Sequence, residues 1–128
     1  MTTWTIAGAA SKCGLSQHTL RWYERIGLLP PIERGGDGRR RFSDRDLDWL
    51  ATMTKLRATG MPVRDMQRYA ELVRSGAGQA ERLALLTRHR ERVRRAIAGQ
   101  RECLKLLEAK IGSYERRLAE ADPIPPSY

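Results

Sequence analysis

The feature that most constrains this chain is a long segment without proline in which apolar residues recur at a regular spacing. Between residues 79 and 118 there is no proline, and the apolar positions alternate at spacings of three and four. At about 1.5 Å per residue, a single helix over this segment is roughly 60 Å long. The positions of the repeat are Leu83, Leu86, Arg90, Val93, Ile97, Gln100, Leu104, Leu107, Ile111, Tyr114 and Leu118.

This repeat is typical of the a/d seam of a coiled coil. In a chain of 128 residues the helix is too long to cover its own seam, so it requires a partner helix. The simplest partner is a second copy, and we predict a coiled-coil homodimer. Arg90 and Gln100 interrupt the seam, either as tolerated exceptions or to set the register or form a small effector pocket. The predicted dimer contacts are Leu83, Leu86, Val93, Ile97, Leu104, Leu107, Ile111 and Leu118.

Near the N-terminus the sequence predicts two short helices, over residues 5–12 and 17–26, joined by a glycine-containing turn. Ser16 is a suitable N-cap for the second helix, and Gly27 suits the position just after its end. This pattern is typical of a helix-turn-helix, although an ordinary helical hairpin has the same outline. The polar residues that begin the second helix favour the helix-turn-helix, because a recognition helix contacts base edges with its N-terminal end.

Residues 32–42 follow with three glycines and three consecutive arginines, Arg39, Arg40 and Arg41. Glycines between extended segments predict a small β-hairpin, and the alternative is a solvated loop. Directly after a helix-turn-helix, a basic hairpin favours the interpretation of a wing that holds phosphates.

Two further helices are predicted over residues 43–60 and 63–75. Ser43 and Asp46 have the spacing of a capping box, and the apolar positions of both helices indicate core. We therefore expect a mainly α protein: a winged helix-turn-helix domain over residues 1–75, a dimerisation helix over 76–118 and a short tail over 119–128.

The charge balance points to a polyanionic partner. Lys and Arg number 24 against 15 Asp and Glu, a net charge of +9, as expected of nucleic-acid binding. No glycine-rich phosphate loop, catalytic triad or pair of carboxylates suggests an enzyme, and no cofactor is expected. The absence of a signal-like or membrane-length apolar segment leads us to expect a cytoplasmic protein. A DNA-binding protein that is indifferent to sequence is the alternative.

Several short motifs together resemble the MerR family of bacterial transcription regulators. They are Thr5-Ile6, Gly14-Leu15-Ser16, the run from Thr19 to Glu24, Ile26 to Pro30, and Gly38 to Ser43. The resemblance covers about residues 4–75 and implies a winged helix-turn-helix with an antiparallel dimerisation helix. It also implies binding to a pseudo-palindromic promoter with an over-long spacer. Activators of this family distort such DNA so that RNA polymerase can engage both promoter elements.

The resemblance also implies roles for individual residues. Ser16, Gln17, His18 and Thr19 are expected to read or touch bases, whereas Arg21 and Tyr23 are expected to hold the DNA backbone. Arg40 matches the wing arginine of the family, and Arg39 replaces the usual wing tyrosine.

Two other segments, residues 59–62 and 110–115, look like the small AdhR/NmlR-type subgroup of the family. Some members of that subgroup sense electrophiles through a cysteine whose position falls on Lys55 here. The two cysteines, Cys13 and Cys103, form no Cys-x-x-Cys motif, so no metal site is predicted. A small-molecule effector, the operator and the direction of regulation stay open.

Overall fold

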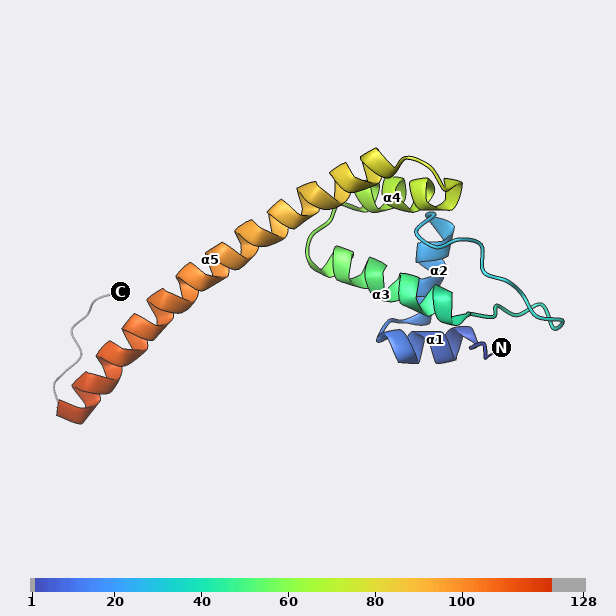
Figure 1. Cartoon of the computed structure of the whole chain (residues 1–128). Helices are drawn as coiled ribbons and strands as arrows, with labels where there is room; N and C mark the ends of the chain where they lie inside the picture. The colour runs from blue at the N-terminus through green and yellow to red at the C-terminus, as the bar shows by residue number, and fades with distance from the viewer. Residues whose placement is uncertain (1, 121–128) are drawn as a thin grey trace. The chain divides into compact units, whose positions relative to one another are not determined.

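The computed structural model describes residues 2–120, and within them the chain forms five α-helices (Figure 1). This agrees with the predicted mainly α fold. The chain divides into two compact units, Met1–His89 and Arg90–Tyr128. None of the described helices has the length and apolar character needed to cross a membrane. The helices are α1 (Ile6–Cys13), α2 (Gln17–Arg25), α3 (Asp44–Ala58), α4 (Val63–Ser75) and α5 (Gln79–Glu120).

The first three helices begin at side-chain caps. Thr5 accepts a hydrogen bond from the Gly8 N–H, so α1 begins one residue later than predicted. Ser16 caps α2, as predicted. Ser43 and Asp46 form the predicted capping box at the start of α3, with each side chain bonded to the backbone N–H of the other. These caps satisfy N–H groups that have no partner within the helix.

The core of the first unit lies where α1, α2, α3 and α4 meet. Leu20 and Tyr23 of α2 are buried together with Leu50 and Met53 of α3 and Met66 of α4. Three side chains from α3 and α4 also hold the turn that follows α2. Their hydrogen bonds run from Trp49 Nε1 to Leu28 O at 2.6 Å, from Gln67 Nε2 to Ile26 O at 2.8 Å and from Arg74 Nη1 to Gly27 O at 2.8 Å.

The wing, residues 32–42, is a small hairpin, as the sequence predicted. Within the described residues its antiparallel pairing is a single bridge between Arg34 and Arg40, and a second bridge joins Trp4 to Phe42. The turn is closed by a hydrogen bond from the Gly35 N–H to the Arg39 carbonyl at 2.8 Å. The Trp4 bridge places the entry of α1 at the base of the wing.

The first turns of α5 belong to the first unit. Leu85 and His89 are both 5 % exposed, and Leu85 is part of the core cluster. His89 Nε2 lies 2.8 Å from Thr59 Oγ1, at the C-terminal end of α3. The compact unit therefore extends to His89, beyond the predicted boundary at residue 75. Helix α5 continues through Ala119 and Glu120, and the rest of the predicted tail, 121–128, lies outside the described residues.

Candidate nucleic-acid interface

Helix α2 has one buried and one exposed face. Leu20 and Tyr23 are each 1 % exposed, whereas Gln17, His18 and Arg21 lie on the exposed side. The Arg21 guanidinium lies 3.5 Å from Gln17 Oε1, one helical turn away. Three of the side chains predicted to contact DNA are therefore accessible from the same side of α2.

Ser16 and Thr19 are bonded to each other at the start of α2. Ser16 Oγ accepts the Thr19 N–H at 3.0 Å and donates its proton to Thr19 Oγ1 at 2.9 Å. These bonds fix the first turn of α2 and leave the Thr19 hydroxyl proton available for another acceptor. Base contacts by both residues stay predictions.

Tyr23 lies on the core face of α2. Tyr23 is 1 % exposed in the core of the first unit. The centroid of its ring lies 5.7 Å from the centroid of the Trp22 ring. The Arg57 guanidinium lies 4.9 Å from the Trp22 ring and 5.8 Å from the Tyr23 ring. The ring packs on the core face, three residues after Leu20, and the backbone contact expected of Tyr23 stays a prediction.

Arg40 also has a different environment from the one expected of a wing arginine. Its Nε donates to Glu24 Oε1 at 2.7 Å, and both side chains are half-buried. The Ile32 N–H donates to the other Glu24 oxygen at 3.0 Å. Burial alone would raise the pKa of Glu24, but these hydrogen bonds and the charges of Arg40 and Arg34 hold it below its ordinary value. Arg40 therefore fastens the wing to α2.

The other arginines of the wing are more exposed. Arg39 is exposed, and Arg41 Nη2 lies 3.5 Å from Asp37 Oδ2. The pKa of Asp37 is lowered, mainly because its carboxylate accepts the Arg39 backbone N–H at 3.0 Å. Arg34 donates to the Gly38 carbonyl at 2.8 Å. Sequence reasoning did not select Arg34, although its position in the same basic hairpin was a signal.

One arginine of α2 and three of the wing line a concave surface of about 420 Å³, which we call the basic hollow. It combines Arg21 of α2 with three arginines from the wing and the first residues of α1. Arg41 is not part of it. The residues that line the basic hollow are Thr5, Ile6, Ala7, Arg21, Arg34, Gly38, Arg39 and Arg40.

The helix termini reinforce this charge. Neither α1 nor α2 has an acidic residue in its first turn. The other three helices do, with Asp44 and Asp46 in α3, Asp65 in α4 and Glu81 in α5. A helix N-terminus carries a partial positive charge that an acidic residue offsets. The N-termini of α1 and α2 therefore keep their attraction for anions, and that of α1 lies at the basic hollow.

The two cysteines lie in different environments. Among residues 2–120, no group of three or more His, Cys, Asp or Glu side chains could hold a metal ion. Cys13 is half-buried, and burial raises the pKa of its thiol. Cys103 is exposed on α5. A raised thiol pKa lowers the fraction of reactive thiolate at Cys13.

A helix-turn-helix followed by a basic wing, with arginines gathered beside the N-terminus of α1, defines a winged helix-turn-helix DNA-binding protein. Residues 4–72 match the MerR HTH family of regulatory proteins. The chain belongs to this family, as the sequence motifs predicted. It is accordingly a MerR-type DNA-binding transcription regulator rather than an enzyme.

Individual relatives agree with this assignment. The chain is 42 % identical over 118 residues to an HTH-type transcriptional regulator of Haemophilus influenzae, covering 91 % of this chain and 87 % of the relative. It is 34 % identical over 89 residues to the HTH-type transcriptional regulator AdhR of Bacillus subtilis, covering 69 % of this chain and 64 % of AdhR. The crystal structure of HiNmlR, described as a MerR family regulator lacking the sensor domain and bound to promoter DNA, superimposes with a TM-score of 0.85. Its identity is 40 %, over 94 % of this chain and 97 % of that one.

Proposed function

We propose that this protein binds a pseudo-palindromic promoter site as a homodimer and distorts the DNA to control transcription. Each protomer places the exposed face of α2 against base edges, with Gln17 and His18 nearest the bases. Arg21, Arg39 and Arg34 hold phosphates around the basic hollow. In this proposal the dimer presents its promoter to RNA polymerase, directly or through the shape of the DNA, and acts in the cytoplasm, where the chromosome lies.

The observation that carries the proposal is the meeting of four arginines from two elements at the N-terminus of α1. A phosphate needs guanidinium or N–H donors, and both kinds are present there. The Glu24–Arg40 pair supports the same use, because it fixes the position of the wing relative to α2. HiNmlR, the relative with 40 % identity, has been captured on promoter DNA.

The homodimer is supported by the exposed apolar seam of α5. Leu83, Leu86, Ile97, Leu104, Leu107, Ile111 and Leu118 are 38–72 % exposed in the single chain, and Val93 is half-buried. Such a row of large apolar side chains is costly to leave in water. A second copy of α5 covers it, and the antiparallel direction follows from the resemblance to the family.

A binding titration separates this proposal from sequence-indifferent DNA binding. The probe is DNA from upstream of the gene that encodes the protein, with a scrambled duplex of the same composition as the control, at several salt concentrations. A regulator binds the upstream DNA about 1,000-fold or more tightly than the scrambled DNA, with an affinity that falls linearly on a log–log salt plot. Equal affinity for both DNAs would favour the architectural alternative, and no binding to either would contradict the proposal.

A further inference from the structure

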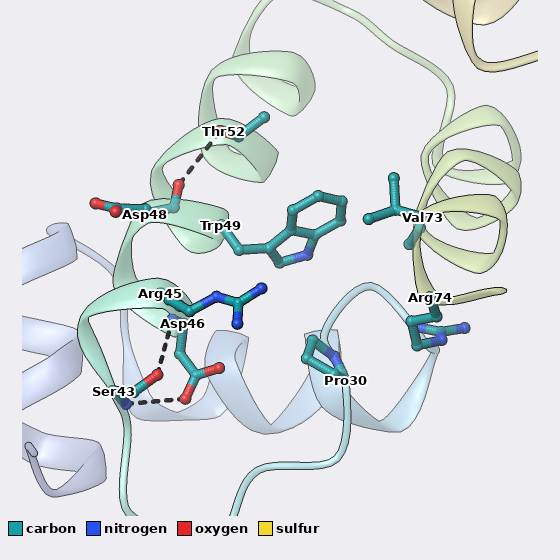
Figure 2. A pocket seen from close by; sticks show the side chains of 10 residues that line it. Pro30, Ser43, Arg45, Asp46, Asp48, Trp49, Thr52, Val73 and Arg74 are labelled. Atoms are coloured by element: carbon teal, nitrogen blue, oxygen red, sulfur yellow. Dashed lines mark hydrogen bonds between the residues drawn. The ribbon is translucent and has the colours of Figure 1, made fainter. Parts of the chain in front are cut away.

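A second concave surface lies in the first unit and shares no lining residue with the basic hollow. It has a volume of about 660 Å³ and lies between the N-terminal half of α3, the C-terminal half of α4 and Pro30 of the segment that leads to the wing (Figure 2). We call it the α3–α4 pocket. Its volume is within the range of sites that bind small organic molecules, about 300–1,000 Å³.

One wall of the α3–α4 pocket is a fixed indole ring. Trp49 is stacked on Tyr69 with ring centroids 5.9 Å apart and planes 2° apart. Its Nε1 donates to the Leu28 carbonyl at 2.6 Å, so the ring is held at its edge as well as at one face. Tyr69 is not a lining residue, and the pocket adjoins the remaining surface of the indole. Pro30 and Val73 add apolar surface opposite the ring (Figure 2).

The charge that faces this indole is that of Arg45. Figure 2 shows the Arg45 guanidinium beside Trp49, and none of the hydrogen bonds or ion pairs within residues 2–120 involves it. Asp46 uses one carboxylate oxygen to accept the Ser43 N–H in the capping box. The Asp48 carboxylate points away from Trp49 in Figure 2. A ligand stacked on the indole therefore meets a guanidinium without a partner.

We propose that the α3–α4 pocket binds a planar aromatic carboxylate, with the ring against Trp49 and the carboxylate on Arg45. Aromatic stacking and a charge-assisted hydrogen bond are the two interactions that these side chains offer together. The walls of the pocket also hold the turn after α2, through Trp49 on Leu28 and Arg74 on Gly27. Occupancy of the pocket is thereby linked to the position of α2, so the ligand changes the affinity for DNA. This linkage rests on the proposed function, whereas the binding site itself does not.

The binding site is tested on the protein alone by NMR, with 2-naphthoate as the probe. The three indole N–H signals of Trp4, Trp22 and Trp49 act as internal reporters, and Trp49→Phe assigns the third. We expect a saturable shift of the Trp49 signal that is absent for Trp4 and Trp22. Acetate, which lacks the ring, and 2-naphthamide, which lacks the charge, should each bind at least tenfold more weakly.

A matched pair of variants tests the role of Arg45. Arg45→Gln should weaken 2-naphthoate binding at least tenfold, whereas Arg101→Gln, an exposed arginine on α5, should leave it unchanged. The proposed site would be contradicted if both variants changed the affinity for 2-naphthoate equally. It would also be contradicted if the indole N–H signals of all three tryptophans shifted together. Neither substitution removes a hydrogen bond given by the structure, so both proteins should fold.

The linkage is tested by repeating the DNA titration with saturating 2-naphthoate. The affinity of the wild type for its DNA should change at least threefold, and that of Arg45→Gln should not change. By reciprocity, DNA should alter the affinity for 2-naphthoate by the same factor. Binding of the probe without any change in DNA affinity would overturn the linkage. A protein that binds no DNA would still give a readable probe titration, so failure of the proposed function is distinguishable.

Discussion

Arg39 and Arg40 are neighbours in the wing, but their surroundings give them different roles. Arg40 is half-buried and paired with Glu24 of α2 at 2.7 Å, whereas Arg39 is exposed beside the basic hollow. A paired, half-buried guanidinium stabilises the fold, because its removal leaves a carboxylate without its partner. An exposed guanidinium contributes little to stability and is available to phosphate.

This contrast predicts opposite outcomes for two alanine substitutions. Arg40→Ala should lower the free energy of unfolding by about 1–3 kcal/mol, since Glu24 keeps only its bond from Ile32. Arg39→Ala should leave stability within about 0.5 kcal/mol of the wild type. It should reduce the log–log salt slope of DNA binding by about 0.9, the value for one phosphate contact. Chemical denaturation and anisotropy titrations measure both quantities, and a stable Arg40→Ala protein would contradict the assignment.

Glu24 predicts a pH dependence of stability. Its folded-state pKa lies below the ordinary value of 4.5, so the ionised carboxylate stabilises the folded state. This stabilisation is complete above the ordinary pKa and is lost as the pH falls through the lower, folded-state pKa. Glu24→Gln should cost about 1 kcal/mol at neutral pH and much less at an acidic pH below the folded-state pKa of Glu24. A cost that is the same at both pH values would show that the charge of Glu24 is not responsible.

At the scale of elements, local signals were readable in the sequence and distant contacts were not. Ser16 and Ser43 lie three residues from the N–H groups that they cap, so spacing alone predicted them. The bond between Trp49 and Leu28 joins residues 21 apart, and that between His89 and Thr59 joins residues 30 apart. Such pairs depend on how the helices pack, which residue type and spacing do not encode.

The candidate site combines both kinds of signal. The spacing of three between Leu20 and Tyr23 places Tyr23 on the apolar face, whereas its expected contact with the DNA backbone comes from the family motif and stays a prediction. Arg40 was predicted to be at the wing, correctly, but its partner Glu24 is 16 residues away and on another element. The residues that line the basic hollow come from α1, α2 and the wing, so their grouping depends on how these elements pack.

The long helix α5 gives a prediction at the same scale. Leu104 is 53 % exposed in the single chain and occupies the middle of the proposed seam. Leu104→Asp places a charge where an apolar contact is expected, so it should convert the dimer to a monomer and abolish tight promoter binding together. The control is Ala109→Asp, an exposed position that the heptad repeat places opposite the seam. Analytical ultracentrifugation reads the assembly state, and a Leu104→Asp dimer would contradict the register.

At the scale of the whole molecule, the two units divide the proposed activity. Met1–His89 contains the exposed face of α2, the wing and the basic hollow, while Arg90–Tyr128 contains most of the apolar seam. Helix α5 runs through both units, and Leu85 and His89 are buried in the first. In the proposed dimer each protomer contributes one basic hollow. Two-fold symmetry of the protein then requires two-fold symmetry of the binding site.

Binding by a symmetric dimer is tested by a hydroxyl-radical footprint on the upstream DNA, made at the protein concentration of half-saturation. A symmetric dimer should give two protected half-sites of equal length, related by an approximate two-fold axis, that disappear together in Leu104→Asp and persist in Ala109→Asp. A single protected site, or uniform protection along the fragment, would contradict binding by a symmetric dimer at a specific promoter.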